Sequence, residues 1–405
     1  MPSGSSSVAP DTSSGPLAGV TVVGFEQAVA APYCTRVLGD LGARVIKVER
    51  PGTGDFARAY DDAANGLATH FAWLNRNKES LTLDIKAAEG RAVLGRLLDR
   101  ADVVVQNLAP DAAARIGIDA ETLTAQRPAL VAVDISGYGT GGPLDHRRAY
   151  DLLVQAEAGA CAVTGEEGRP AKPGPPVADV GSGLQAAVSV LAALVARPTS
   201  GRGAAIEISM FDTVTDFIGF ALLHALYTGQ ERPPIGMGSP VVAPYGAYPT
   251  KDGRLVVLGT TNDAEWQRLA RTLLDRPDLA DDDSFATNAL RCEQRHRLDT
   301  AVAEWTMTLE TDEVLHRADA AGIGSGVYHE ALEVIEHPQL TRRRRWQQVD
   351  SPVGPVSSLL PPFTSSDWPT PLRGVPALGE HTSQILAELG LSAAEQGRLR
   401  AAGVV

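Results

Sequence analysis

Cysteine is scarce in this sequence, and the residue patterns of metal and hydrolase sites are missing. The three cysteines, Cys34, Cys161 and Cys292, are scattered and include no CxxC pair, which argues against a disulfide framework and a cysteine zinc site. The eight histidines form no HExxH or other metal-ligand spacing, so we expect no metal. No GxSxG motif is present, which argues against an α/β-hydrolase.

Long apolar runs and an excess of basic charge are also missing. The longest apolar run, near Ala186–Ala196, is too short to cross a bilayer. The first residues, Met1–Pro16, are rich in Ser, Gly and Pro and lack the basic start and apolar segment of a signal peptide. We therefore expect a disordered tail over residues 1–15, a cytoplasmic protein and no membrane partner. The net charge of -13 argues against a nucleic-acid partner but leaves room for a local basic pocket.

The glycine fingerprint of a nicotinamide-binding unit is missing as well. Leu38–Ala43 precedes a strand that ends at Glu49, an arrangement in which the acid would bind a ribose. The loop after the first strand, Glu26–Pro32, contains no glycine, however. Glu49 is followed at once by Arg50, whose guanidinium suits a phosphate better than a free ribose. A nicotinamide dehydrogenase is therefore disfavoured.

Short β-branched runs alternate with helical patterns from Val20 onward. The pattern predicts strands at 20–25, 44–49, 81–84, 102–106, 130–136 and 204–209, and helices at 33–41, 87–98, 150–158, 184–196 and 211–227. Such alternation is typical of an α/β fold with a parallel sheet covered on both faces. Gly and Pro cluster over 229–249, which predicts a linker, and a smaller α+β region follows it.

Asp179 lies in the octapeptide Pro176–Gly183, directly before an apolar helical run. Unpaired N–H groups and the positive end of a helix dipole would favour its ionised form, and the glycines beside it would let a large ligand approach. An accessible carboxylate of this kind is a plausible nucleophile for acyl transfer. On the octapeptide alone a helix cap is the commoner role.

A second glycine-rich segment, Gly137–Pro143, follows the strand predicted at 130–136 and leads to Arg147 and Arg148. Loops at the carboxyl ends of parallel strands bind ligands in open α/β sheets, and two arginines there could hold phosphates or a carboxylate. A turn with exposed charges explains the pattern equally well. The basic run Arg342–Arg345 is interpreted as a solvated helix end.

Several segments share their order and spacing with one family. They are Pro16–Val20, Ala31–Thr35, Leu41–Pro51, Asn75–Asp84, Asp102–Asn107, Gly137–Gly139, Thr199–Gly203 and Leu378–Thr382. In this arrangement the chain resembles the family III CoA-transferases, or CaiB/BaiF family, from about Pro16 to Val405. The resemblance implies an interlocked, ring-like homodimer. It also implies a Rossmann-like, CoA-binding large domain built from residues 16–200 and 331–405, a linker helix region at 201–229 and a small α+β domain at 230–330.

The resemblance also implies a catalytic mechanism in which Asp179 is the nucleophile. Its carboxylate would attack an acyl-CoA, and a mixed anhydride and then an aspartyl-CoA thioester would follow. N–H groups near Gly181 and Gly183 would stabilise oxyanions, and a glycine loop matching Gly236 and Gly238 would keep water from the anhydride. Many relatives have Gly-Asn and His-Pro in that loop, whereas this chain has Met237 after Gly236.

Coenzyme A contacts carry over from the family to ten positions. They are Val29, Ala30, Arg50, Leu83, Lys86, Asn107, Leu108, Arg115, Arg148 and Tyr150. The cations among them suit the 3′-phosphate and pyrophosphate of CoA, because arginine binds phosphate through two parallel hydrogen bonds.

Two alternatives to a CoA-transferase stay open. The first is an α-methylacyl-CoA racemase of the same superfamily, but these enzymes need a histidine where this chain has Tyr150, and a phenol is a poor base at neutral pH. The second is a non-catalytic CoA-binding paralogue. Among acids, small dicarboxylates such as succinate, citramalate or mesaconate are favoured by the likeness of Ala243–Tyr248 to enzymes that use them, with His146 or Arg147 holding the second carboxylate. Formate, oxalate, carnitine and aromatic acids remain open.

Overall fold

The computed structural model describes residues 15–405, which form two compact units. Unit 1 contains the described residues up to Gly159, together with Gly174–Phe217 and Arg342–Val405; unit 2 contains Ala160–Pro173 and Ile218–Thr341. The tail predicted at 1–15 lies, apart from Gly15, outside the described residues. The domain boundaries given above stay predictions, because contacts within one chain define compact units rather than independently folding domains.

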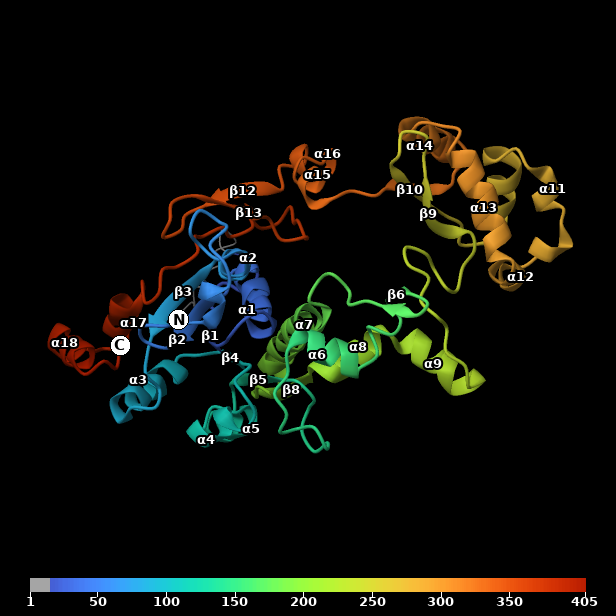
Figure 1. The fold of residues 1–405 in the computed structure, drawn as a ribbon. Coiled ribbons are helices and arrows are strands. Elements are labelled where there is room, and N and C mark those ends of the chain that lie inside the picture. Colours follow the sequence, from blue (N-terminus) through green and yellow to red (C-terminus); the bar gives the residue numbers. More distant parts are fainter. Residues whose placement is uncertain (1–14) are drawn as a thin grey trace, which may run out of the picture. The chain divides into compact units, whose positions relative to one another are not determined.

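Unit 1 is built on a six-stranded parallel sheet with the strand order β3-β2-β1-β4-β5-β8 (Figure 1). The strands are β1 (Thr21–Phe25), β2 (Arg44–Glu49), β3 (Lys78–Thr82), β4 (Val103–Gln106), β5 (Val131–Ser136) and β8 (Ala205–Ser209). The central strands β1 and β4 are almost wholly buried, as expected for a parallel sheet covered on both faces. This confirms the predicted α/β class and the parallel sheet.

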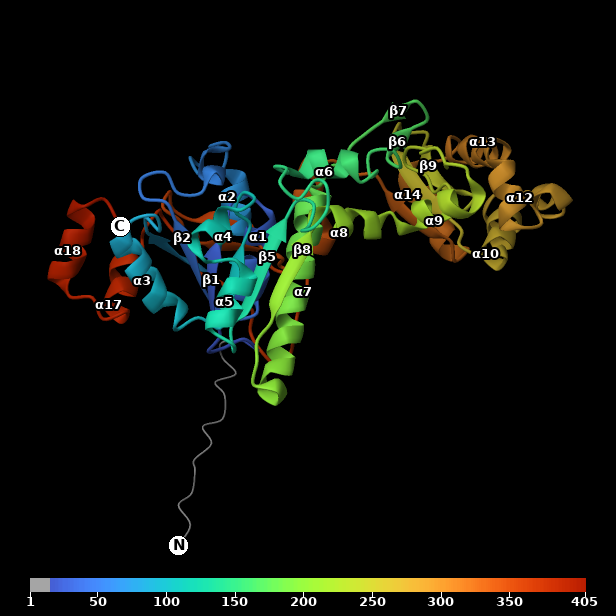
Figure 2. The same ribbon diagram turned by 90° about the horizontal axis from the view of Figure 1, so that it is seen from below.

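Helices cover both faces of this sheet. Val23, Ile46 and Val104 point to one face and pack against the helices α3, α5, α17 and α18, so both ends of the chain share one hydrophobic core. Figures 1 and 2 both show the C-terminal helices beside α3. On the other face α1 and α7 pack against each other and the sheet. The helices are α1 (Ala30–Asp40), α2 (Thr69–Leu74), α3 (Ala88–Leu98), α4 (Ala112–Ile116), α5 (Ala120–Gln126), α6 (Asp151–Glu157), α7 (Val177–Ser200), α8 (Met210–Phe217), α17 (Thr382–Glu388) and α18 (Ala393–Ala401), with the 3₁₀ helix η2 at Phe56–Ala59.

Several elements differ from their predicted limits, among them one strand and two helices. The third strand begins at Lys78, whose buried ammonium group is paired with Glu26 rather than solvated. The helix predicted at 184–196 begins at Val177, so Gly181 and Gly183, which were predicted to precede it, lie inside it. The helix predicted at 211–227 is broken at Ile218 into α8 and α9 (Gly219–Thr228).

The basic run also departs from the prediction of a solvated helix end. It forms a turn between α16 (Pro338–Thr341) and the strand β12 (Trp346–Val349), which pairs with β13 (Val356–Leu359). Arg345 is buried and donates to the carbonyl oxygens of Leu360, at 3.1 Å, and Pro361. One of the four cations therefore stabilises backbone carbonyls rather than facing water.

Helix α7 is the one described helix that is long and apolar enough to cross a membrane by length and composition. Helix α7 is longer than the apolar run seen in the sequence, because the helix starts seven residues earlier than predicted. Core helices of soluble proteins pass the same test, and part of α7 is buried against α1 and β5. The absence of a membrane partner and the cytoplasmic location stay predictions.

Unit 2 has an antiparallel sheet packed against helices. The order is β11-β10-β9, and Trp266, Phe285 and Val302 belong to the buried core. Its elements are the hairpin β6 (Gly165–Glu166) and β7 (Arg169–Pro170), α9, β9 (Tyr245–Pro249), β10 (Leu255–Gly259), α10 (Asp263–Arg268), η3 (Leu269–Leu273), α11 (Pro277–Ala280), η4 (Asp283–Phe285), α12 (Asn288–Glu293), α13 (Arg295–Thr306), α14 (Thr311–Ala320), β11 (Gly324–Val327), α15 (Ala331–Ile335) and α16.

Candidate active site

The carboxyl ends of the unit 1 strands form the edge where a ligand is expected. Chain order runs outward from β1 to β2 and β3 on one side, and to β4 and β5 on the other, so the order reverses between β1 and β4. Open α/β sheets bind ligands at such a reversal, outside the carboxyl ends of the strands. Arg50, Leu83 and Asn107 each follow directly the strand that precedes them, so three predicted CoA contacts start at this edge.

The loop after β1 is held at this reversal by side chains instead of glycines. The amide of Asn107 accepts from the Gln27 N–H and donates to the Gln27 carbonyl, both at 2.9 Å. Asp55 accepts from the Ala28 N–H at 3.1 Å, and Ala28 has a left-handed φ of 58°. Val29 and Ala30 follow with buried side chains, so their backbone is the part that a ligand could reach.

Below this loop lies a buried cluster of charges that the sequence analysis did not identify. Lys47 Nζ lies 2.8 Å from Asp55 and 3.2 Å from Glu26, and Lys78 Nζ lies 2.7 Å from Glu26. Burial alone would raise the pKa of Glu26, but the two lysines outweigh it and lower that pKa to about 2. Charged residues within apolar strands were the sequence signal for this cluster. Its effect is to connect the loop, through Asp55, to the interior of the sheet.

Asp179 is the third residue of α7, and its side chain does not cap the helix. Asp151, at the start of α6, performs that role, since its Oδ1 accepts from the N–H of Ala178 at 3.0 Å and of Asp179 at 3.5 Å. The other oxygen of Asp151 accepts from Gln155 at 2.6 Å. The cap interpretation of Asp179 is therefore wrong, and its own carboxylate does not bond the helix N-terminus.

The protonation equilibrium of Asp179 also differs from the expectation. Burial, and secondly the charge of Asp151, raise the pKa of Asp179 to about 7. The sequence predicts that the helix N-terminus favours the ionised form, but the carboxylate of Asp151 that caps the helix brings a like charge to the same place. Near neutral pH a substantial fraction of Asp179 is ionised, and that fraction is more basic than an ordinary aspartate.

The two glycines after Asp179 serve helix packing. A Cβ on Gly183 would collide with the Ala30 carbonyl oxygen of α1, and one on Gly181 would lie 2.6 Å from the Phe217 ring of α8. Both residues lie within α7, where N–H groups beyond the first turn bond carbonyls four residues earlier. The N–H groups of Gly181 and Gly183 thus lie in the hydrogen-bonding pattern of the helix, and their expected oxyanion role stays a prediction.

The cations predicted to bind CoA are exposed. Within residues 15–405, the side chains of Arg50, Lys86, Arg115 and Arg148 make no hydrogen bond or ion pair with the protein. The apolar members differ from them, since Leu83 is buried and Leu108 packs against the core. Tyr150 is exposed and directly precedes α6. Four unpaired cations thus follow, along the chain, the strands that end at the edge where a ligand is expected.

The predicted shielding loop lies in unit 2. Gly236 has a left-handed φ of 65°, and its N–H donates to the Gly165 carbonyl of the β6–β7 hairpin at 2.6 Å. A Cβ on Gly238 would lie 2.9 Å from the Ile235 side chain. The hairpin therefore anchors this loop, whose shielding role stays a prediction.

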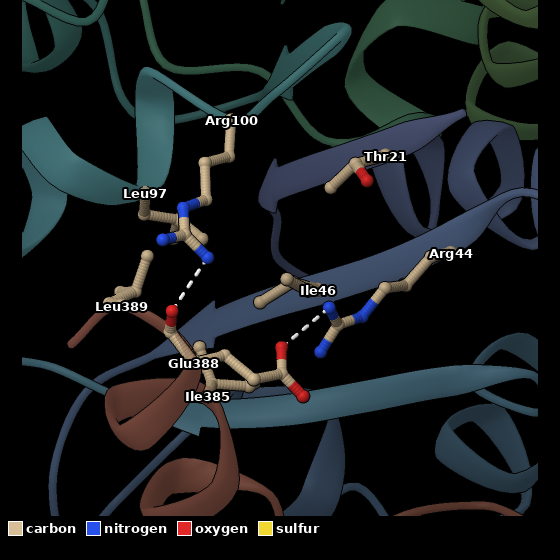
Figure 3. A pocket seen from close by; sticks show the side chains of 8 residues that line it. All are labelled: Thr21, Arg44, Ile46, Leu97, Arg100, Ile385, Glu388 and Leu389. Carbon is tan, nitrogen blue, oxygen red and sulfur yellow. Dashed lines mark hydrogen bonds and ion pairs between the residues drawn. The ribbon is translucent and has the colours of Figure 1, made fainter. Parts of the chain in front are cut away.

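A small cavity of about 100 Å³ lies at the opposite, amino edge of the sheet (Figure 3). Its charged groups are paired: Arg44 lies 2.7 Å from both Glu79 and Glu388, and Arg100 donates to the Glu388 carbonyl. Because these charges are satisfied and the cavity starts where β1 and β2 begin, it belongs to the packing of α17 rather than to the candidate site. Among the described residues no group of three or more potential metal ligands occurs.

Comparison with known proteins identifies the family of this chain. The model of CoA-transferase family III matches residues 17–382. A succinate–glutarate CoA-transferase of Agrobacterium fabrum is 33% identical, covering 92% of this chain and 96% of its own, and a succinyl-CoA–D-citramalate CoA-transferase of Chloroflexus aurantiacus is 32% identical, covering 96% and 98%. The crystal structure of a CaiB/BaiF family protein from Brucella suis has a TM-score of 0.79 at 33% identity, over 93% of this chain and 100% of that one. The chain therefore belongs to the family III CoA-transferases and is a transferase enzyme.

Proposed function

We propose that the protein moves CoA from an acyl-CoA donor to a free carboxylic acid, with Asp179 as the nucleophile. The observation that supports this proposal most directly is the position of Asp179. It is partly buried at the start of α7 with a pKa raised to about 7, and its carboxylate is not consumed by capping. A carboxylate with this pKa is ionised often enough to attack and basic enough to be a good nucleophile.

The exchange proceeds through three covalent intermediates, two mixed anhydrides and the aspartyl-CoA thioester between them. A carboxylate oxygen of Asp179 attacks the thioester carbonyl, the C–S bond breaks, and CoA thiolate leaves a mixed anhydride. The thiolate attacks the aspartyl carbonyl and expels the donor acid, which gives an aspartyl-CoA thioester. The acceptor carboxylate then attacks this thioester, and the returning thiolate cleaves the second anhydride to release the new acyl-CoA and free Asp179. No proton has to be transferred in any step, since every attacking and leaving group is an anion.

CoA would lie along the carboxyl edge of the unit 1 sheet. Arg50, Lys86, Arg115 and Arg148 are unpaired cations that would neutralise its phosphates. The β1–α1 loop, held by Asn107 and Asp55, would supply backbone groups at the point where the strand order reverses.

Small dicarboxylic acids are the proposed substrates. Relatives about one third identical are named for succinate, glutarate, D-citramalate and mesaconate, which supports this class. A racemase is the weaker alternative, because Tyr150 stands where racemases carry histidine.

A homodimer is the proposed assembly. Helix α9 has no buried residue, and exposed Phe220, Leu223, Leu226 and Tyr227 give it a large apolar surface. Surfaces of this kind are characteristic of protein interfaces. Sedimentation velocity of the wild-type chain would test the dimer directly.

The nucleophile is tested by substitution and trapping. Asp179→Ala should abolish exchange between succinyl-CoA and a panel of acids while CoA binding and the thermal transition persist. With the wild type, hydroxylamine added after succinyl-CoA should form a hydroxamate at Asp179, detectable by peptide mass spectrometry. Exchange by Asp179→Ala above a trace, or modification at another residue, would refute the mechanism. Deuterium incorporation next to the thioester carbonyl, without acid exchange, would favour the racemase.

A further inference from the structure

Five aromatic side chains form a continuous strip on unit 1. Along the strip the ring centroids lie 5.8 Å apart for Phe56–Tyr60, 5.5 Å for Tyr60–His70, 6.3 Å for His70–Trp73 and 6.0 Å for Trp73–Tyr33. Phe, Trp and Tyr make up only 5% of the chain, so this concentration is unusual. The strip joins η2, α2 and α1, of which α2 and α1 lie side by side in Figure 1.

The aromatic strip is exposed although its supporting elements are anchored. Phe56 and Tyr60 are each 48% exposed and Trp73 is 37% exposed. Below them Phe71 is fully buried, and the Arg58 guanidinium lies 3.8 Å from its ring centroid. Exposed aromatic rings on a fixed support are typical of ligand-binding surfaces.

Packing of α7 on α1 places one end of the strip near Asp179. A Cβ on Gly183 would lie 2.9 Å from the Tyr33 Cβ, so these two residues touch. Asp179 lies four residues before Gly183 and therefore on the same face of α7, one turn away. Tyr33 begins the aromatic strip, so the strip runs outward from the nucleophile.

The other part of the strip also lies within reach of Asp179. The pKa of Tyr60 is raised by burial and further by the charges of Asp55 and Asp179 and by Tyr150. The effect of Asp179 on Tyr60 agrees with the contact between Gly183 and Tyr33, which is an independent observation. The two observations together place the aromatic strip beside the carboxylate that receives the acyl group.

Two members of the strip carry hydrogen-bonding groups that are not used. The Tyr60 hydroxyl and the His70 ring nitrogens make no hydrogen bond with residues 15–405. The nearby Asp61 is engaged elsewhere, accepting from the Thr69 hydroxyl at 2.6 Å and from the Thr69 and Ala63 N–H groups at 3.0 Å each. An incoming anion can therefore take both donors.

We propose that the aromatic strip binds the acid substrate, with His70 and Tyr60 donating hydrogen bonds to the carboxylate farthest from the reacting one. The proposal rests on the proposed function and assigns dicarboxylic acids to this subsite. The methylene chain would lie against the ring faces, and the second carboxylate would meet a phenol and an imidazole rather than His146 or Arg147. A monocarboxylic acid of equal length would leave both donors without an acceptor, which costs affinity.

The test compares glutarate with pentanoate, which have the same number of carbons but differ in the second carboxylate. In a double-displacement mechanism, kcat/KM for the acceptor reports only its reaction with aspartyl-CoA, so the donor does not affect it. Wild type should prefer glutarate. His70→Phe and Tyr60→Phe keep the ring contacts, and each should lower kcat/KM for glutarate about tenfold or more while leaving pentanoate within about twofold, since each removes one hydrogen bond to a charged group.

Matched controls separate this proposal from the proposed function. His316→Phe, on the exposed face of α14, should change neither acid, and all variants should keep the wild-type thermal transition. Equal losses for both acids, no loss for either, or a wild-type preference for pentanoate would overturn the dicarboxylate subsite while exchange chemistry persists. Absence of exchange with every acid in the wild type would instead overturn the proposed function.

Discussion

Asp151 affects the nucleophile in two ways, because it caps α7 and because it places a negative charge near Asp179. Replacing Asp151 by Asn separates these two effects. The Asn side chain keeps an oxygen that can accept the Ala178 N–H, now bonded to Asp151 at 3.0 Å, but it removes the negative charge. Burial of Asp179 is unchanged, so its pKa should fall below the present value of about 7 and stay above the ordinary 3.8. The carboxylate would then be ionised over a wider pH range and be less basic.

The size of this shift follows from the charge that is lost. Two unit charges roughly 6 Å apart at an effective dielectric constant of about 20 repel by about 3 kcal/mol, which corresponds to about two pKa units. Solvent screening makes this an upper limit, so we expect the pKa of Asp179 to fall by about one unit.

The assay is the pH dependence of kcat/KM for the acyl-CoA donor. The rate depends on the ionised nucleophile, so it falls as pH drops through the pKa of Asp179. In Asp151→Asn this acid limb should move to lower pH, with a lower plateau above pH 8 because the nucleophile is less basic. Asp151→Ala also removes the helix cap and should lose about 1 kcal/mol of stability. An unmoved acid limb, or one moved to higher pH, would refute the like-charge explanation.

Three further predictions concern the packing of Gly183, the binding of CoA phosphates by Arg148 and the pH dependence of stability that Asp179 causes. Gly183→Ala should lower the free energy of unfolding by about 1–3 kcal/mol, measured by urea denaturation, because its Cβ collides with the backbone of α1; an unchanged midpoint would contradict the packing role. Arg148→Ala should raise KM for acyl-CoA several-fold with kcat unchanged, and the effect should weaken at high salt, whereas equal losses in both constants would contradict a role in phosphate binding. Asp179→Asn should stabilise the fold at pH 8 by up to about 4 kcal/mol, which is the cost of a pKa raised from 3.8 to about 7, and leave it unchanged near pH 3. The folded-state pKa of Asp179 is raised, so ionisation destabilises the native state as pH rises from about 4 to about 7; equal thermal transitions at pH 8 would refute this reasoning.

The pairing of the buried charges could not be predicted from the sequence. Lys47 and Lys78 occupy strand positions and lie in two segments shared with the family. Their pairing with Glu26 and Asp55 nevertheless depends on three strands lying side by side. A buried ion pair is weak evidence for stability by itself, but removing one partner leaves an uncompensated charge. The cluster is best understood as the support of the β1–α1 loop, because Asp55 connects it to the Ala28 N–H.

The sequence by itself determined the parallel α/β sheet, the family and the position of Asp179. Strand–helix alternation with buried strands depends on local hydrophobic pattern, and the arginines that follow the strands are ordered along the chain, so both can be recognised without coordinates. Only the tertiary structure decided that Asp151 caps α7, that Gly181 and Gly183 accommodate neighbouring helices, and that the pKa of Asp179 is raised. Each of these depends on contacts between helices distant in sequence, and burial and like charge act through space rather than along the chain.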